Sequence, residues 1–477
     1  MQHTRFRFGR VAAGLALIGL VAAGACNTDK LLTVPTPDVV LPQNLTGASV
    51  LPNAYAAAIG DFQVAYAGDG GNVVGTFGST EGLVLMSGLL SDELLDAETF
   101  PTRLEVDRRA TNPVNATMLS IFQLAQRARA STELVAASYA KYDPNNANRA
   151  EIQALSAYMY ILFAEDYCNG VPTSTVNPDG SFTFGASQTG TQMLTAAVAK
   201  LDSAITVATA AGASGTTALN LARIGKGRAL LDLNQPAAAA AAVAAVPSTF
   251  VYNMLHDENT SRQYNGVYVF TVSSKRFTVA NNEGGNGIPF VTTNDPRVPV
   301  VRTGTGFDGT TPFYRTPKYT SLAQNPARGA PTPLALGTEA RLIEAENALI
   351  NNDDVTFLAK LDSARAAAKT YSDTPTPPAS PAPITTVPLD APSKQNLLFT
   401  ERAYDLYLTA HRLGDLRRLI WQYGRNSEAV FPTGPYNPLG AAAGNNYGTD
   451  VNLPIPFEES NNPQYKGCLD RSAAFGS

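Results

Sequence analysis

Apolar residues recur at steps of three and four over four long segments in the first half of the chain, the spacing of helices with one buried face. Glycine, proline and asparagine mark the ends of these segments, which run over 114–142, 148–167, 190–211 and 217–234. The last one leads through Asn234 and Gln235 into an alanine-rich segment that Pro236 opens and Pro247 closes. Small alanines let a second helix lie close to its neighbour, so we predict a helix pair of roughly the size of a tetratricopeptide (TPR) repeat.

A second pair of this kind is expected over 338–369, and the chain between the two pairs has a different character. Over 250–335 helical periodicity gives way to Gly, Pro, Thr, Asn and aromatic residues, with short strands such as "GVYVFTV" at 266–272. We therefore expect a mainly α fold in which TPR-like helix pairs support an irregular, loop-rich, ligand-facing lobe with a few short strands. The expected parts of this one unit are a helical region over 46–249, the lobe over 250–335, and C-terminal helices with a tail over 336–477.

The stretch "ERAYDLYLTAHRLGDLRRLI", Glu401–Ile420, carries a dense run of charged residues on a helical pattern. Its apolar positions fall at steps of three and four, which predicts a buried face. Gly414 is expected to interrupt the helix, with Asp415 capping a new one. Arg412 and Asp415 lie one turn apart and are expected to pair. The pattern favours a structural corner between two packed helices over a reaction centre.

The N-terminus follows the pattern of an export signal. Three arginines within the first ten residues precede an apolar run over 11–25, which is shorter than the roughly 20 residues of a membrane-spanning helix. The run ends in "AGAC", and these small residues before Cys26 resemble the lipobox of bacterial lipoproteins. We expect a signal peptide over 1–25, lipidation of Cys26 and a tether over 26–45. The alternative is an ordinary cleaved signal in which Cys26 is incidental.

Two further cysteines, Cys168 and Cys468, remain after Cys26. In the oxidising compartment of an exported protein, an even number of cysteines favours a disulfide. This bond would tie the C-terminal tail back to the first helical region. Two buried free thiols are the alternative.

The charge balance argues against one class of partner. The chain has 35 Lys and Arg against 40 Asp and Glu, with a formal net charge of -5, so it lacks the broad basic surface of a nonspecific nucleic-acid binder. Only His256 and His411 follow Cys26, which leaves no His-rich metal site. The one G-x-G-x-x-G, at 304–309, is not followed by a helical pattern and is expected to be a turn. We expect no cofactor and no metal ion.

Loop positions supply the candidates for ligand binding. Aromatic residues beside Gly, Asn and Arg are typical of sites for sugars and peptides, because a ring buries apolar area while polar neighbours orient the ligand. Core packing is the alternative for each residue. The only tryptophan, Trp421, lies outside these loops, so peptides are as credible as glycans. From loop position and chemistry alone we predict ligand contacts by Asp92, Phe100, Arg103, Tyr314 and Tyr319.

The run "SDELLDAETF" over 91–100 raises the alternative of a hydrolase, because it holds four carboxylates. A glycoside hydrolase needs two carboxylates that face each other across roughly 5 to 9.5 Å, and nearness in sequence does not predict that. We expect no catalytic residue. A secreted glycoside or peptide hydrolase is one alternative, and a TPR-like scaffold that binds a partner's peptide or helix is another.

Together these segments resemble the SusD/RagB family of nutrient-uptake lipoproteins of the bacterial outer membrane. Three segments fit the family in order, namely "NDPRVPV", "TPKYT" and "EARLIEAENAL". The stretch over 401–420 resembles the family's C-terminal signature, from which it departs where Asp405 and Thr409 replace glutamates and Ala410 replaces glycine. The matches to the signature are Glu401, Arg402, Leu406, His411, Arg412, Asp415, Leu416 and Arg418.

The resemblance implies a mostly helical binding protein with no chemistry of its own. Members of the family are lipid-anchored in the outer membrane, face the cell exterior and cap a TonB-dependent transporter of the SusC type. They capture oligosaccharides or peptides and pass them into the barrel. The expected partners are therefore a SusC-like transporter, such a ligand, and the lipid membrane through Cys26. Ligand contacts vary between members, so the resemblance assigns none of them here.

Overall fold

The computed structural model describes residues 45–71, 80–177, 181–319, 327–374, 376–468 and 470. They belong to one compact unit, Pro42–Ser477. The expected signal peptide, Cys26 and nearly all of the expected tether lie outside the described residues.

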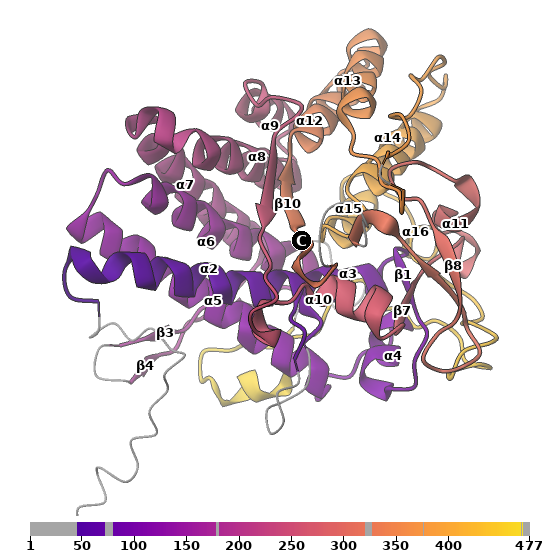
Figure 1. Ribbon diagram of the computed structural model, residues 1–477, viewed down its shortest axis with the longest axis horizontal. Helices are drawn as coiled ribbons and strands as arrows, with labels where there is room; N and C mark the ends of the chain where they lie inside the picture. The colour runs from indigo at the N-terminus through magenta and orange to yellow at the C-terminus, as the bar shows by residue number, and fades with distance from the viewer. Residues whose placement is uncertain are drawn as a thin grey trace, which may run out of the picture. The chain divides into compact units, whose positions relative to one another are not determined.

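Helices supply most of the regular structure, which confirms the mainly α fold. Helices α2 and α5 to α8 pack against one another in sequence order, and α9 joins α8 to α12; Figure 1 shows these helices together in one half of the molecule. The longer helices are α2 (Leu51–Ala67), α3 (Gly82–Leu90), α5 (Ala116–Tyr142), α6 (Ala147–Asp166), α7 (Gly190–Ala210), α8 (Thr216–Asp232), α9 (Pro236–Val243), α12 (Gly337–Ile350), α13 (Asp354–Ala367), α14 (Ala391–Asp405) and α15 (Arg412–Trp421). The short ones are α4 (Pro101–Asp107), α10 (Gly266–Tyr268), α11 (Phe290–Thr293) and α16 (Ser427–Val430).

The two expected helix pairs, α8–α9 and α12–α13, turn in the same way. Asn234 between α8 and α9 and Asn352 between α12 and α13 both have a φ of 56°, a left-handed conformation that asparagine tolerates better than most residues. Pro236 begins α9, as predicted, and Asp353 caps α13 by accepting a hydrogen bond from the Thr356 amide. A Cβ atom on Gly227 of α8 would lie 2.4 Å from Val243 of α9, so glycine allows the first pair to pack closely.

The strands are short and pair two by two. Each of the five sheets in the described residues has two antiparallel strands, so no sheet forms a layer and the strands serve to fix loops. The pairs are β1 (Leu94–Asp96) with β7 (Phe277–Val279), β2 (Val171–Pro172) with β5 (Ser187–Gln188), β3 (Thr175–Val176) with β4 (Phe182–Thr183), β6 (Val251–Met254) with β10 (Thr332–Leu336), and β8 (Val301–Thr305) with β9 (Pro312–Arg315).

The strand predicted at 266–272 is wrong, because this segment forms α10 and a π-helical turn over Val269–Ser273. Asn265 caps the segment by accepting a hydrogen bond from the Tyr268 amide (3.1 Å). Val267 and Phe270 are fully buried. They are three residues apart, which is helical spacing. β-Branched residues alternate along the segment and favour a strand, so the sequence pattern did not indicate the helix.

The corner in the stretch over 401–420 lies before the position that the sequence indicated. Helix α14 ends at Asp405 and α15 begins at Arg412, and between them Leu408 and Ala410 have φ values of 51° and 55°. Gly414 does not interrupt a helix but lies inside α15, where an added Cβ would come within 3.0 Å of the Glu165 side chain. This glycine therefore serves close packing of α15 against α6.

The predicted Arg412–Asp415 pair is also wrong. Arg412 instead donates to both carboxylate oxygens of Asp92 (2.6 and 2.8 Å), 320 residues away. Asp415 accepts hydrogen bonds from Arg402 Nε (2.8 Å) and Arg418 Nη2 (3.0 Å). The partner of Arg412 comes from another element because Arg402 and Arg418 already occupy Asp415.

The ion pairs around Asp415 are buried and link three helices. Arg418 of α15 also donates to Glu346 of α12 (2.6 Å), while Arg402 belongs to α14. Burial alone would raise the pKa of Asp415, but Arg402 and Arg418 hold it well below its ordinary value. The charged carboxylate therefore stabilises the fold above the pKa of an unfolded aspartate, about 3.9, and this contribution is lost as the pH falls through the lower folded pKa.

Replacing Asp415→Asn should lower the free energy of unfolding by about 3–5 kcal/mol, because two buried guanidinium groups lose their shared anion. Urea unfolding at pH 7 measures the change. Glu458→Gln, at an exposed position, is the matched control and should differ from wild type by less than about 0.5 kcal/mol. Equal urea midpoints for the two variants would contradict the role given to this network.

Candidate ligand-binding site

Two exposed phenylalanines and two arginines form a cluster on the surface, the aromatic surface cluster, which comprises Phe100, Arg103, Arg276 and Phe307. Phe100 is 46% exposed and Phe307 is 53% exposed. The guanidinium carbon of Arg276 lies 4.2 Å from the ring centroid of Phe307 and 5.0 Å from that of Phe100. Arg103 lies 5.0 Å from the Phe100 centroid. Both rings are thus held against cations while much of their surface stays open to solvent.

Backbone hydrogen bonds join the three segments that carry the cluster. The Ala97 amide donates to the carbonyl of Arg276 (2.7 Å), and the Asp308 amide donates to the carbonyl of Ala97 (2.9 Å). Next to Phe307, a Cβ on Gly306 would lie 2.4 Å from Ala97 Cβ, so only glycine allows this close approach. The G-x-G-x-x-G segment, predicted to be a turn, indeed connects β8 to β9 and helps to place Phe307.

Buried carboxylates balance the two arginines of the cluster. Glu98, which is fully buried, accepts hydrogen bonds from Arg103 Nη1 (2.8 and 3.0 Å) and pairs with Arg276. Glu81 pairs with Arg103 from the other side. Burial alone would lower the pKa of Arg103, but Glu81 and Glu98 outweigh it and raise that pKa. The rings therefore rest on a rigid base whose charges are compensated.

The structure divides the five predicted ligand contacts. It brings Phe100 and Arg103 together in the cluster and places Tyr314, partly buried, on β9. Asp92 is fully buried and bonded to Arg412, and Tyr319 is fully buried with its hydroxyl donating to the carbonyl of Leu408 (3.0 Å). Neither side chain can meet a ligand at the surface, so the predictions for Asp92 and Tyr319 are corrected: both support the fold.

Two residues of the cluster were not predicted as ligand contacts. Phe307 is one of the aromatic residues of the irregular lobe that lie beside glycine. Its glycine neighbours were the only feature of the sequence that indicated an exposed ring. Arg276 gave no signal, because it precedes β7 as an ordinary polar flank. Its role arises from the pairing of β7 with β1, whose Asp96 lies opposite Phe277.

The acidic run over 91–98 does not build an open carboxylate pair. Asp92, Glu93, Asp96 and Glu98 are all buried, with at most 1% of any of them exposed. Burial raises the pKa of Glu93 to about 8, and the neighbouring charge of Asp92 adds to this, while a hydrogen bond from the Leu408 amide opposes it. Glu93 is thus a buried acid of the fold, and the hydrolase alternative loses the residues that motivated it.

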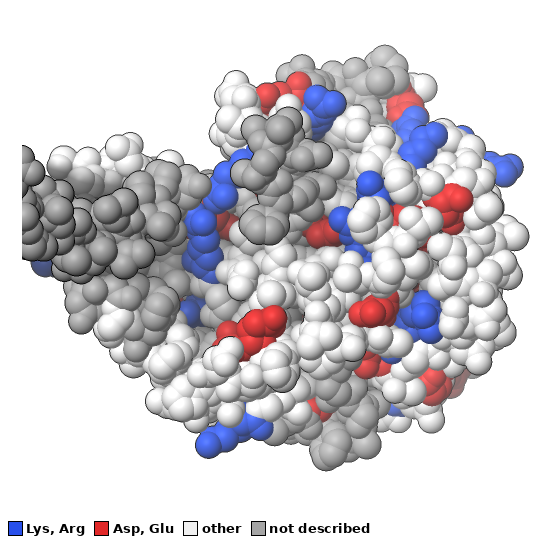
Figure 2. Space-filling model, turned by 90° about the horizontal axis from the view of Figure 1, so that it is seen from below, with Lys and Arg blue, Asp and Glu red and all other residues white. Residues whose placement is uncertain are grey.

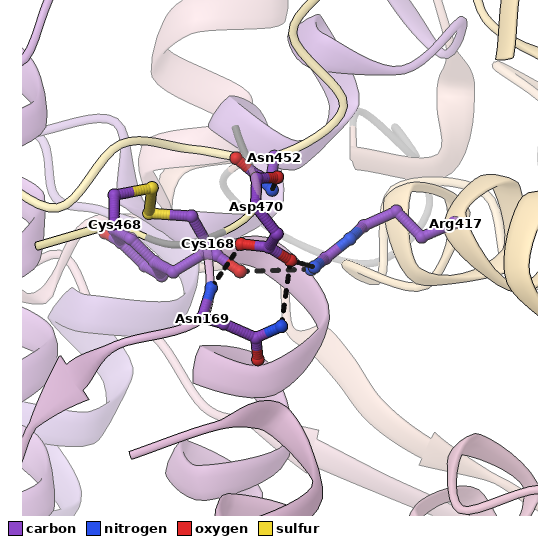
Figure 3. Close-up of a disulfide and its surroundings, with 7 residues drawn as sticks. Cys168, Asn169, Arg417, Asn452, Cys468 and Asp470 are labelled. Atoms are coloured by element: carbon purple, nitrogen blue, oxygen red, sulfur yellow. Dashed lines mark hydrogen bonds and ion pairs between the residues drawn. A yellow bond between two sulfur atoms is a disulfide. The ribbon is translucent and has the colours of Figure 1, made fainter. Parts of the chain in front are cut away.

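Cys168 and Cys468 are joined by a disulfide with an S–S distance of 2.04 Å. Figure 3 shows this bond beside Asp470, whose carboxylate accepts a hydrogen bond from Asn169 Nδ2 (3.0 Å) and lies 3.4 Å from Arg417 Nη2. The two cysteines and Asp470 form the one close group of three potential metal ligands in the part of the chain that the structure describes. The disulfide consumes both sulfurs, so this group does not suit a metal ion.

The face shown in Figure 2 carries scattered Lys, Arg, Asp and Glu side chains with wide uncharged areas between them. A nucleic-acid backbone would require a continuous basic surface.

Comparison with known proteins identifies the fold. No protein-family model and no curated protein sequence matches the chain, whereas many solved structures do. A SusD-like carbohydrate-binding protein from Bacteroides vulgatus is 13% identical with a TM-score of 0.62, covering 88% of this chain and 98% of that one. A SusD/RagB family protein from Bacteroides thetaiotaomicron is 13% identical with a TM-score of 0.61, covering 92% and 98%. A laminarin-binding SusD-like protein is 16% identical with a TM-score of 0.53, covering 89% and 100%. The chain has the SusD-like fold, which confirms the fold that the sequence resemblance implied.

Replacing Glu93→Gln should flatten the pH dependence of stability between about pH 4.5 and 8. Folded Glu93 keeps a proton up to about pH 8, whereas the unfolded side chain releases it near pH 4.3. The wild-type free energy of unfolding therefore contains a term that falls as the pH rises through this window. Urea unfolding at pH 5, 6, 7 and 8 measures the difference between wild type and variant.

The same series on Glu458→Gln should follow wild type at every pH, because Glu458 is exposed. A constant difference between Glu93→Gln and wild type across the window would show that folded Glu93 titrates normally.

Proposed function

We propose that this chain is a nutrient-binding protein that captures oligosaccharides or peptides on the aromatic surface cluster and delivers them to a TonB-dependent, SusC-like transporter. One observation carries the proposal: Arg276 holds the exposed rings of Phe100 and Phe307 in place. Rings that are fixed before the ligand arrives lose little conformational entropy on binding.

The chemistry of the cluster fits ligands with alternating apolar faces and polar groups. The phenylalanine rings can cover the apolar face of a sugar or a peptide side chain, and the guanidinium groups beside them can donate to hydroxyl or carbonyl oxygens. Oligosaccharides are the first class to test, since structures with this fold include proteins described as carbohydrate-binding and laminarin-binding. Peptides are the second class.

The proposed location is the outer face of the outer membrane, with the chain anchored through lipid on Cys26. The export pattern over 1–25 and the "AGAC" segment support this, as does the SusD-like fold. Several acyl chains hold a protein stably on a membrane, where a single chain would not. We propose that the anchored protein binds ligand itself and carries out no reaction.

Phe100→Ala and Phe307→Ala should each weaken ligand binding at least tenfold, about 1.4 kcal/mol, because each removes one ring. Isothermal titration calorimetry against laminarin, other glycans and a peptide panel identifies the ligand and measures the loss. Phe457→Ala is the matched control, since Phe457 is 60% exposed on η10 (Phe457–Asn461), outside the cluster. A wild-type chain that binds nothing in either panel, or that releases products, would contradict the proposal.

The lipid-anchored protein should recover a TonB-dependent barrel when it is purified from outer membranes in mild detergent. Mass spectrometry of the purified material identifies the barrel and the acyl chains on Cys26. Cys26→Ser should abolish acylation and move the chain from the membrane fraction to the soluble fraction. Recovery of the wild-type chain without any barrel, in repeated preparations, would remove the transporter from the proposal.

A further inference from the structure

The helical half of the molecule holds a cavity that shares no residue with the aromatic surface cluster. Its volume is about 230 Å³, and it lies where α6 ends, α7 begins and α8 ends, against one side of α15. A single water needs about 10–15 Å³ of such space, so there is room for roughly fifteen water-sized groups. This is the bulk of a small ligand rather than of one structural water.

Trp421, the only tryptophan of the chain, forms one wall of the cavity. The guanidinium carbon of Arg417 lies 4.3 Å from the centroid of an indole that is only partly buried. Arg417 is itself fixed, because its Nη1 donates to the carbonyls of Ala164 (2.9 Å) and Tyr167 (3.1 Å). The indole is therefore backed by an immobile cation, and part of its surface remains free.

The C-terminal tail holds Arg417 from the other side (Figure 3). Asp470 lies 3.4 Å from Arg417 Nη2, and Asn169 Nδ2 donates to the same carboxylate oxygen (3.0 Å). The disulfide Cys168–Cys468 ties this part of the tail to the segment that follows α6. Hydrogen bonds and the disulfide thus fix the side chains that form this wall of the cavity.

The polar wall contains one group without a partner and one carboxyl pair. Among the described residues of the wall, Trp421 Nε1 has no hydrogen-bond partner, whereas the Asp232 carboxyl group shares a hydrogen bond with that of Glu165. Buried polar atoms of this kind are normally satisfied by a bound molecule or by ordered water. Burial raises the pKa of Asp232 well above its ordinary value and the charge of Glu165 adds to this, while Arg418 opposes it. The proton of Asp232 is thus donated to the Glu165 carboxylate, and Asp232 can still accept a hydrogen bond from a hydroxyl group.

The charged groups in the wall already have opposite charges beside them. Arg418 donates to Glu346 (2.6 Å) and to Asp415 (3.0 Å), and Glu165 pairs with Arg228. A charged ligand would have to compete with these buried ion pairs, whereas a neutral ligand would leave them intact. The cavity therefore favours a neutral molecule.

We propose that this cavity is a second binding site, which takes one neutral hydroxylated ring of the size of a single sugar residue. The ring stacks on the free surface of Trp421, and one of its hydroxyl groups meets the Asp232 carboxyl group. The inference deepens the proposed function, on which it rests for the class of ligand, and it adds a site separate from the aromatic surface cluster.

The single tryptophan makes the site directly measurable, because its emission reports on this cavity alone. Glucose, galactose, N-acetylglucosamine and arabinose are titrated into the full mature chain while Trp421 fluorescence is recorded. We expect a saturable change with at least one of these sugars. No change with any of them up to 100 mM would overturn the proposal, and a response to a charged dipeptide but to no sugar would overturn the ligand class.

Two substitutions on α7 locate the response. Thr191 is exposed and lines the cavity, so Thr191→Tyr should obstruct it and weaken the response at least tenfold. Thr195 lies one turn further on, is exposed and does not line the cavity, so Thr195→Tyr should respond as wild type does. An unchanged response in Thr191→Tyr would show that the signal does not come from this cavity.

A third variant separates this inference from the proposed function. Phe100→Ala should weaken oligosaccharide or peptide binding at least tenfold, as measured by calorimetry, and should keep the Trp421 response to monosaccharide. If the wild-type chain binds ligand at the aromatic surface cluster while Trp421 stays silent, only the second site fails. If calorimetry finds no ligand at all but Trp421 responds, the proposed function fails and the cavity stands.

Discussion

The fold depends on the charge of Asp415, which lies buried between Arg402 of α14 and Arg418 of α15. Arg418 continues the chain of ion pairs to Glu346 of α12. Buried ion pairs add little net stability, since desolvation offsets their attraction, but a buried charge without its partner is costly. An arrangement that separated these three helices would leave such a charge if it stayed buried, so we expect the network to select one arrangement more than to strengthen it.

The same corner places the proposed ligand site. The segment between α14 and α15 leads into Arg412, which pairs with Asp92. Within this segment, the Leu408 amide donates to the buried Glu93 (2.8 Å). Asp92 and Glu93 immediately precede β1, and the loop after β1 carries Phe100. A surface cluster that must present rings in fixed positions is thereby tied to the buried Arg412–Asp92 ion pair and to the buried Glu93. Scaffolding of this kind limits how far a site can drift between free and bound states.

Local sequence patterns predicted the helices well, but they did not predict which distant segments pair with each other. The periodicity over 190–211 and 217–234 matches α7 and α8 within two residues, because burial on one face is written into neighbouring positions. The partner of Arg412 lies 320 residues away, and only the assembled fold brings it near. Ala410 is instructive, since the family signature has glycine there. Its φ of 55° shows why: this position requires the left-handed conformation, which alanine adopts at a cost of about 1–2 kcal/mol.

The aromatic residues of the two proposed sites differ in kind, because the only tryptophan, Trp421, lies outside the loops. The exposed rings are phenylalanines, which have no polar atom and rely on Arg103 and Arg276 for hydrogen-bond donors. Trp421 brings its own donor but lies in a cavity whose wall depends on Asp470 and the disulfide. The open cluster can contact any stretch of a long ligand, while a pocket of about 230 Å³ has room for the one ring that we propose for it. In the proposed function, size selection therefore belongs to the cavity, and affinity for long chains belongs to the surface cluster.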